Sequence, residues 1–503
     1  MLLALLTIGN IPSRSYGNGW EHGAIPFEAL VEALQFDSPE MRLRATRSLG
    51  IRGQAEAVEP LLQCLARPEK NPHVRSALYI SLGKLKDRRA VAVLADCIDR
   101  ESRDELRADC ATALGMLGDK TILPLLLTVL NKDPSFLVQS STVEALGNFA
   151  EDKAVAALSK IVAGAGNRNL RQRAIRALGM TGSPNAVQPL LKALAGSRHD
   201  SERLLIVKSL TPLRSPQAIT PLTHILETTA NSQLRTQIVI SLGAIRTGDT
   251  FPILIDMLAD KVPAVRYFAV VSLKELGRRE AAVPIARLSL DISKRLERLA
   301  DAELLTDPLP ALADLSLQDA ALQAITALDA SYGLDALLSG ARPRRLPLDS
   351  AGALKLAEGY YRVRRTALAG LGYTGVRTAA DFLKTSAGIG DSDFRLRATA
   401  VRALGVLGYA DDIDGLLAAL QDSAAEVRWT AAMVLGRLGN QEAAGPLMDA
   451  LSDVNSEVKR QGALSLGYLG DRGALGALKN LAENDGSEKV KTAAAFSLRL
   501  LSN

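Results

Sequence analysis

A row of basic side chains is the part of this sequence that could bind a charged ligand. Arginine or lysine recurs about every 32 residues, often with an aspartate six residues before it. Such a row could hold phosphates of a nucleic acid. A structural ladder is the favoured interpretation, because a turn aspartate can cap the next helix while the arginine bridges turns, and a binding site has no reason to recur in nearly every repeat. The best examples of this ladder are Arg266, Arg397, Arg428, Asp260, Asp391 and Asp422.

No set of residues forms a recognisable catalytic or metal site. The four histidines, His22, His73, His199 and His224, are scattered singly, without the helical spacing of a metal-binding pair. No Gly-x-Ser-x-Gly elbow or phosphate-binding P-loop occurs, and Gly164-Ala165-Gly166 lacks the third glycine of a dinucleotide loop. The sequence therefore predicts a protein that is not an enzyme, with no catalytic residue, metal site or cofactor.

The basic residues belong to a repeat that runs along almost the whole chain. A small residue, leucine and glycine recur together, as in Ser81-Leu82-Gly83 and Ala403-Leu404-Gly405. The spacing is 31–33 residues, except for steps of 23 and 43 residues around Asp329. Fifteen copies are found when those with Thr211, Lys274, Thr306, Asp329 and Arg499 in place of the glycine are counted. A near-constant period of this length is typical of a solenoid, in which each repeat packs only on its neighbours.

Each repeat is predicted to hold two helices. A proline recurs near the start of the first, helix A, as at Pro60, Pro189 and Pro284, where its missing N–H costs no hydrogen bond. The second, helix B, is predicted to end at the leucine–glycine pair, because glycine suits a helix end. We number this glycine as position 0, which puts the basic residue at −8 and the aspartate at −14.

The composition favours stacked thin layers of helix over a globular core. Of the 503 residues, 47% are hydrophobic but only 4% are aromatic. We predict an all-α fold, an α-solenoid of about 15 two-helix repeats of about 32 residues. No apolar run reaches the roughly 20 residues of a membrane span, and three cysteines are too few for a disulfide framework.

The chain divides into four predicted segments. Residues 1–24 precede the repeats, residues 25–338 and 355–503 form two repeat arrays, and residues 339–354 form a loop between them. Two prolines and a glycine argue against helix in this loop. Two interpretations stay open for it, a tolerated surface insertion and a basic contact loop or hinge. The second would use Arg342, Arg344 and Arg345.

The first residues leave the cellular location open. Met1–Ile8 is apolar, and Ser13-Arg14-Ser15 has the small-x-small form of a cleavage site, which resembles a secretory signal. A basic region ahead of the apolar run is missing. Export and cytoplasmic residence are therefore equally open.

The repeat resembles a known one. An aspartate followed by Val-Arg-x-x-Ala-x-x-Ala-Leu-Gly-x-Leu-Gly is best matched at Asp422–Gly439 and Asp391–Gly408. This pattern resembles the short HEAT repeat, which is found in phycobilisome bilin lyases and many other bacterial proteins, and the resemblance covers about residues 28–503. It implies a two-helix solenoid, and it adds an alternative function as an accessory subunit of a bilin lyase or similar cofactor-attachment system.

Helix B is predicted to turn one side away from the core. At 100° per residue, positions −7, −3 and 0 lie opposite the alanine at −5. In HEAT-like solenoids this side lines the concave surface. Apolar, aromatic and arginine side chains mix there, as they do in protein-binding hot spots. The predicted partner-binding residues are Arg176, Lys208, Tyr267, Val271, Arg365, Arg402, Trp429, Met433 and Arg460.

The leading hypothesis is a non-enzymatic scaffold that binds another protein, of unknown identity, on this concave surface. The bilin-lyase role and nucleic-acid binding are the alternatives. Nucleic acid is the weaker candidate, because 60 basic residues are nearly balanced by 55 acidic ones and the two tryptophans are isolated. Self-association through the last helix, with Phe496, Leu500 and Leu501, is a further hypothesis.

Overall fold

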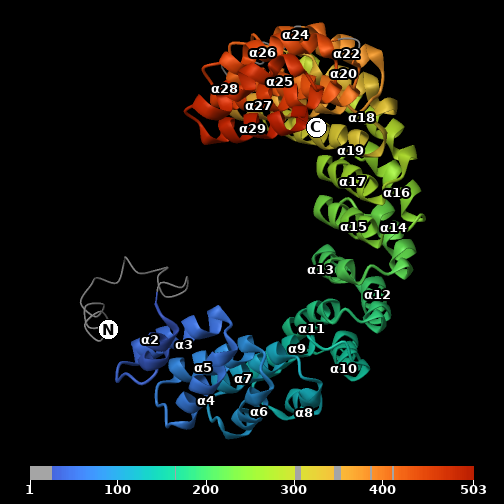
Figure 1. Cartoon of the computed structure of the whole chain (residues 1–503). Helices are drawn as coiled ribbons and strands as arrows, with labels where there is room; N and C mark the ends of the chain where they lie inside the picture. The colour runs from blue at the N-terminus through green and yellow to red at the C-terminus, as the bar shows by residue number, and fades with distance from the viewer. Residues whose placement is uncertain are drawn as a thin grey trace. The chain divides into compact units, whose positions relative to one another are not determined.

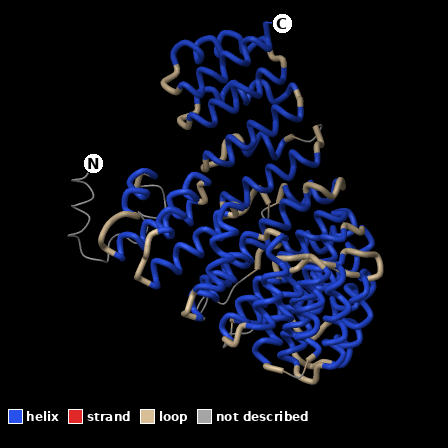
Figure 2. The backbone as a smooth tube through the Cα atoms, turned by 90° about the horizontal axis from the view of Figure 1, so that it is seen from below, coloured by secondary structure: helices blue, strands red, loops and turns tan. Residues whose placement is uncertain are grey.

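The structure is a computed structural model that describes residues 25–164, 166–300, 308–344, 353–385, 388–410 and 413–502. These residues form α-helices and short 3-10 turns, and no strand occurs among them. Figure 2 shows the helices joined by short loops. The all-α solenoid is confirmed. None of the described helices has the length and apolar character needed to cross a bilayer. The predicted segment 1–24 lies outside the described residues.

The chain has two compact units, Met1–Ile245 and Arg246–Asn503. In the first unit the B helices lie along the inner side of a curved row (Figure 1). Its A helices are α2 (Phe27–Ala33), α4 (Val58–Ala66), α6 (Val91–Arg100), α8 (Leu123–Lys132), α10 (Asp152–Ala163), α12 (Val187–Gly196) and α14 (Ile219–Thr228). Its B helices are α3 (Pro39–Arg52), α5 (Pro72–Leu85), α7 (Asp104–Leu117), α9 (Phe136–Leu146), α11 (Arg168–Met180), α13 (Asp200–Leu210) and α15 (Ser232–Ile245).

The second unit repeats the same alternation. Its A helices are α16 (Thr250–Asp256), α18 (Ala282–Ala300), α20 (Leu334–Ala341), α22 (Arg377–Leu383), α24 (Asp414–Ala419), α26 (Ala444–Asp449) and α28 (Leu475–Asn484). Its B helices are α17 (Pro263–Leu276), α19 (Leu309–Asp329), α21 (Ala353–Leu371), α23 (Phe394–Leu407), α25 (Ala425–Leu438), α27 (Ser456–Leu469) and α29 (Glu488–Ser502). The described helices thus form fourteen A–B pairs.

In most repeats the glycine at position 0 lies inside helix B, whereas α9 ends at Leu146 and α21 ends at Leu371, directly before this glycine. Helix B continues to a second glycine three residues later, which takes the left-handed conformation that ends the helix, as Gly439 (φ 74°) and Gly470 (φ 73°) do. Because glycine has no Cβ, it adopts this backbone conformation without strain. The predicted helix end was therefore right for α9 and α21 and too early, commonly by two or three residues, in the other repeats with this glycine.

The glycine at position 0 lets neighbouring B helices touch. A Cβ on Gly115 would stand 2.6 Å from the Cα of Ala145, and one on Gly467 would stand 2.5 Å from Oγ of Ser497. These distances are shorter than a carbon can tolerate, so only glycine fits the present spacing. Position 0 is consequently buried against the next repeat, and its predicted place on the open side of helix B was wrong.

The repeats around Asp329 are longer than the others. Helix α17 packs on α19, and α19 packs on α21, so two long repeats occupy the stretch where the spacing suggested three. Asp329 is the last residue of α19, and Thr306 lies outside the described residues. The two irregular spacings therefore reflect longer helices as well as a loop.

The predicted loop 339–354 is shorter at both ends. Helix α20 includes residues 339–341, and helix α21 begins at Ala353. The compact units divide between Ile245 and Arg246, inside the predicted first array. The division into two arrays on either side of the loop stays a prediction.

The first unit contains a disulfide bond that the cysteine count did not suggest. It joins Cys97 on α6 to Cys110 on α7, with their Cα atoms 6.3 Å apart. It therefore fastens helix A to helix B within one repeat. The third cysteine, Cys64, is free and buried, as expected for a small apolar side chain.

Candidate functional site

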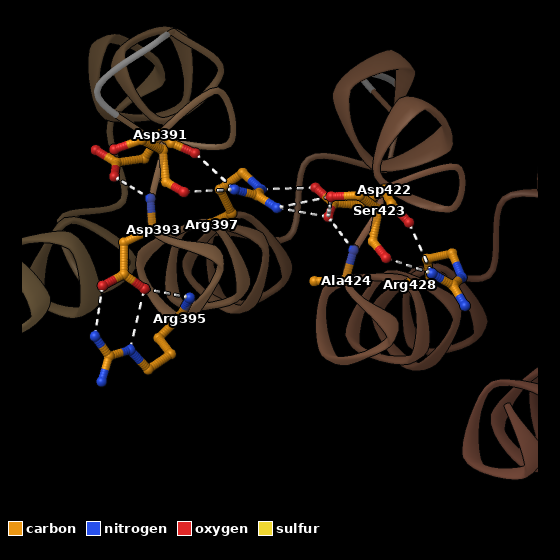
Figure 3. A network of polar contacts seen from close by, with 9 residues as sticks. Asp391, Asp393, Arg395, Arg397, Asp422, Ser423, Ala424 and Arg428 are labelled. Carbon is orange, nitrogen blue, oxygen red and sulfur yellow. Dashed lines mark hydrogen bonds and ion pairs between the residues drawn. The ribbon is translucent and has the colours of Figure 1, made fainter.

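Arginines at position −8 link successive turns of the solenoid (Figure 3). Arg397 Nε and Nη2 donate to the carboxylate of Asp422, both at 2.7 Å, while Nη1 donates to the backbone oxygen of Asp391 at 2.8 Å. Asp422 Oδ1 also accepts the N–H of Ala424 at 2.7 Å. Each guanidinium thus ties its own turn to the next one, and its donors are used inside the protein.

The same link recurs in both units. Arg428 donates to Asp453 at 2.7 and 2.9 Å and to the backbone oxygen of Asp422 at 2.8 Å. The Arg428 guanidinium lowers the pKa of the Asp453 carboxyl below its ordinary value, and the N–H of Asn455 adds to this effect. Equivalent pairs are Arg42–Glu69, Arg75–Glu101, Arg107–Asp133, Arg171–Glu202, Arg364–Asp391 and Lys459–Asp485.

Arg266 departs from this pattern. Its Nη1 donates to the backbone oxygen of Asp260 at 2.8 Å, but the carboxylate of Asp314 is 4.0 Å away. Arg295 holds Asp314 instead, at 2.8 and 3.0 Å. Burial, and then the nearby charge of Arg295, lower the pKa of Arg266. The ladder is therefore rearranged where the repeats become longer.

The predicted partner-binding residues lie on seven B helices, α11, α13, α17, α21, α23, α25 and α27. Arg176, Lys208, Tyr267 and Arg365 are exposed, whereas Val271, Arg402, Trp429, Met433 and Arg460 are half-buried. The structure brings two of them together, since the Arg402 guanidinium lies 5.7 Å from the centre of the Trp429 ring. Arg176 and Lys208 belong to the first unit and the other seven to the second.

The sequence prediction missed two further positions on this side of helix B. Residues at +1 and at −11 are exposed or half-buried, whereas the glycine at position 0 is mostly buried. The signal was available, because −11, −7, −3 and +1 are four residues apart and share one side of a helix. We call these four positions the open face. Its exposed apolar members at +1 include Ile51, Met180, Tyr373, Val406, Tyr468 and Leu500.

Aromatic side chains gather on the open face of the second unit. We call the following seven the aromatic face: Tyr267, Tyr361, Tyr373, Phe394, Trp429, Tyr468 and Phe496. In the described part of the first unit, only Phe136 holds such a position. Tyr468 and Phe496 form an edge-on pair with ring centres 6.4 Å apart, and Arg395 lies 4.4 Å over Tyr361. This side of the second unit therefore combines rings and guanidinium groups.

A hollow opens on the same side between α17 and α19. Lys274 holds the place of the close-contact glycine on α17, and a lysine is not buried against a neighbouring helix as glycine is. The hollow has a volume of about 250 Å³. It is lined by Tyr267, Val271, Lys274, Glu275, Ser316, Asp319, Ala320 and Gln323.

The loop arginines are not all available to a partner. The side chain of Arg344 is only 8% exposed, and its Nη2 donates to the backbone oxygen of Ser339 at 3.2 Å. Arg342 is exposed, and its backbone oxygen accepts the hydroxyl of Tyr360 at 2.5 Å. Arg345 lies outside the described residues. Among the described residues, no group of three or more His, Cys, Asp and Glu side chains could hold a metal ion.

Comparison with protein families identifies the repeat. The family model for HEAT repeats matches residues 27–115, 99–165, 160–243, 219–306, 352–426 and 413–499. The chain belongs to the HEAT-repeat family. The comparison with curated proteins gave no match.

Solved HEAT-repeat structures share the fold at low sequence identity. Kap95p in its complex with RanGDP is 14% identical, with a TM-score of 0.54 over 96% of this chain and 73% of that one. Yeast importin-β (Kap95p) is also 14% identical, with a TM-score of 0.53 over 96% of this chain and 73% of that one. The CpcE–CpcF complex of phycocyanin lyase from Nostoc is 21% identical, with a TM-score of 0.33 over 53% of this chain and 98% of that one. The two Kap95p comparisons, together with the family match, show a HEAT-repeat solenoid fold, which is typical of protein-interaction scaffolds and usually non-catalytic.

Proposed function

We propose that this HEAT-repeat chain is a non-enzymatic scaffold that binds another protein along the aromatic face of its second unit. The observation that carries the proposal is the contrast between the units. Both build the same helix pairs and the same ladder, yet among the described residues the open face of the second unit holds seven aromatic residues and that of the first holds one. Packing does not require Tyr373 and Tyr468, since they are 63% and 61% exposed.

The chemistry of the aromatic face suits a protein partner. Tryptophan, tyrosine and arginine dominate protein-binding hot spots because they bury large areas and still make directed contacts. Exposed rings on a scaffold that does not need them mark an interaction site. The hollow beside Tyr267 adds a place for one anchoring side chain of the partner.

The ladder does not support nucleic-acid binding. The N–H groups of its arginines already donate hydrogen bonds to carboxylates and backbone oxygens of the turns, as those of Arg397 and Arg428 do. A phosphate backbone would have to break these bonds to be bound. No observation favours the bilin-lyase role over a general scaffold.

Site-specific photo-crosslinking in the native cell extract tests the proposal. A benzoylphenylalanine replaces Tyr468 in one variant and Met180 in the other, two +1 positions that are 61% and 59% exposed. We expect a partner to cross-link from position 468 and not from position 180. A partner captured equally from both positions, or only from 180, would contradict the proposed face.

Removal of two aromatic rings provides a second test of the proposal, in the chain that carries the crosslinker at position 468. We expect Tyr267→Ala with Trp429→Ala to lower the yield of the cross-linked partner at least about tenfold, since hot-spot residues each contribute about 2 kcal/mol or more. Tyr332→Ala is the matched control, because Tyr332 is 62% exposed but lies outside the B helices. Equal yields from both variants, with unchanged circular dichroism, would refute the role of the rings.

A further inference from the structure

The open face of the last five B helices, α21, α23, α25, α27 and α29, carries more positive than negative charge. Four arginines lie at the open-face positions −7, −3 and +1, and two more lie at the adjacent position −10; the six are Arg362, Arg365, Arg395, Arg402, Arg437 and Arg460. Three acids lie beside them, Glu426 and Glu457 at −10 and Glu488 at −11, and each has a basic partner. Glu426 accepts from Arg402 at 3.0 Å, and Glu457 pairs with Arg460. These pairs leave a positive excess along the face.

Part of this excess is free for a ligand. Arg362, Arg365 and Arg437 are exposed, and none of them has an ion pair with another described residue. Arg395 is held by Asp393 at 2.7 Å and lies 4.4 Å over Tyr361. Free guanidinium groups therefore alternate with rings across neighbouring helices, and such groups form paired hydrogen bonds with carboxylates.

The helix A side of the same repeats has a different pattern. Glu442 and Asp449 lie there together with Arg472 and Lys479, all four of them exposed. Both signs are thus mixed on that side, without exposed rings on α24, α26 or α28. The positive excess belongs to the side that also bears the aromatic face.

We propose that the partner contributes an acidic segment with apolar or aromatic anchors, which lies across helices α21–α29. This inference rests on the proposed scaffold function and names the chemistry of its partner. The anchors would pack on Trp429, Met433 and Tyr468, and the carboxylates would pair with the free arginines. Like charges would disfavour a basic segment.

A protein segment fits this face better than a nucleic acid does. Glu426 and Glu457 interrupt the arginines, so the face offers no continuous row of basic groups to a chain with a phosphate at every nucleotide. Met433, Leu464 and Leu500 add aliphatic surface between the rings, which suits apolar side chains. Single-stranded DNA is accordingly kept as a probe that can overturn the proposal.

The helix spacing sets the length of the probe. Packed helices lie about 10 Å apart, and an extended chain advances about 3.3 Å per residue. One helix is thus crossed about every three residues, and the five helices need about 15 residues. The probes are peptides of about this length with the repeats Glu-Phe-Ser, Gln-Phe-Ser and Lys-Phe-Ser, together with oligothymidine.

Tryptophan fluorescence gives a local reading of binding. The chain has two tryptophans, Trp20 and Trp429. In the full chain carrying Trp20→Phe, the remaining tryptophan is Trp429, which belongs to the aromatic face. We expect the Glu-Phe-Ser peptide to change its emission and to bind at least about fivefold more tightly than the Gln-Phe-Ser peptide. Raising the salt from about 50 to about 500 mM should remove most of this advantage.

Charge variants separate the face from the rest of the surface. We expect Arg365→Gln with Arg437→Gln to weaken the acidic peptide about three- to tenfold. Arg472→Gln with Lys479→Gln removes the same charge from the helix A side and should leave binding unchanged. Equal effects of the two pairs would overturn the proposal.

The other outcomes are also decisive. Equal binding of the acidic and neutral peptides would overturn the acidic partner and leave the scaffold proposal standing. Tighter binding of the basic peptide than of the acidic one would also overturn the acidic partner and leave the scaffold proposal standing. The same conclusion would follow if no peptide bound while photo-crosslinking at position 468 still succeeded. Tighter binding of oligothymidine than of every peptide would overturn both proposals.

Discussion

The two compact units have the same scaffold but different open faces. Each has seven helix pairs, and each has ladder pairs such as Arg107–Asp133 and Arg397–Asp422. Each also brings B helices into contact through glycine, as at Gly115 and Gly467. In the part of each unit that the structure describes, the open face of the first unit has one aromatic residue and that of the second has seven. The rings are therefore not needed to build the repeat, and they belong to what the repeat presents.

The largest expected effect tests whether the scaffold is the same in both units. Gly115→Ala and Gly467→Ala should each destabilise their own unit by about 3 kcal/mol, because the new methyl group meets the next helix at 2.5–2.6 Å. Region-resolved hydrogen exchange measures this for each unit. Gly476→Ala is the control, since nothing lies within 4 Å of its Cβ, and it should be neutral or stabilising. A large loss in one unit only would break the comparison.

The disulfide gives a difference in stability between the units. Replacing Cys97 and Cys110 by alanine should lower the free energy of unfolding of the first unit by about 2–3 kcal/mol, because the bond closes a short loop. Hydrogen exchange in the second unit should not change. A reductant should act on the natural chain and not on the double variant. Equal exchange of the oxidised and reduced chain around α6 and α7 would contradict this prediction.

A ladder pair should contribute less to the free energy of unfolding than a close contact at a position-0 glycine does. Asp422→Ala leaves the partly buried Arg397 without its carboxylate and should cost about 1–3 kcal/mol in local stability. In a double-mutant cycle, Asp422→Ala with Arg397→Ala should cost less than the sum of the single changes. Glu442→Ala, an exposed acid, is the control and should change stability by no more than about 0.5 kcal/mol. Additive single effects would mean that the pair does not act as a link.

The ladder also predicts a dependence on pH in both units. Arg428 holds the pKa of Asp453 below its ordinary value. Burial opposes the same shift at Asp133, but Arg107 and the N–H of Ser135 outweigh it. A carboxyl with a lowered folded pKa stabilises the fold above its unfolded value of about 4, and this stability is lost as the pH falls through the folded pKa. The protection of backbone amides, measured as the exchange rate relative to the intrinsic rate at each pH, should therefore fall in both units below about pH 4. A loss of protection on raising the pH from about 5 to about 7 would contradict this.

The smallest expected change in stability comes from the aromatic face. Phe394→Ser and Tyr468→Ser should each alter the free energy of unfolding by less than about 1 kcal/mol, because these rings are 41% and 61% exposed. Thermal unfolding followed by circular dichroism measures this. Met180→Ser in the first unit is the matched change. Losses well above that of Met180→Ser would show that the rings are part of the packing, and the contrast between the open faces would lose its meaning.

Much of the architecture followed from the period of about 32 residues and the position of the basic residue. Two positional errors had one cause, the role of the glycine. It was expected to end helix B, but Gly115 and Gly436 lie within their helices and contact the next B helix. The distance between helices is a property of packing, and a single repeat does not encode it. The +1 residues, such as Tyr468, were missed because position 0 was placed on the open side in their stead, although their four-residue spacing from −3 was visible in the sequence.

By itself, the sequence determined an all-α solenoid, its repeat and the side of helix B that bears Tyr267 and Trp429. Local patterns suffice for this, because each repeat packs mainly on its neighbours. Only the tertiary structure decided that the arginines bridge successive turns, that the glycines are contacts and that Cys97 meets Cys110. It also decided that seven aromatic residues, scattered over more than 200 positions of the sequence, share one side of the second unit. These features depend on distances between repeats, which arise only when the helices stack.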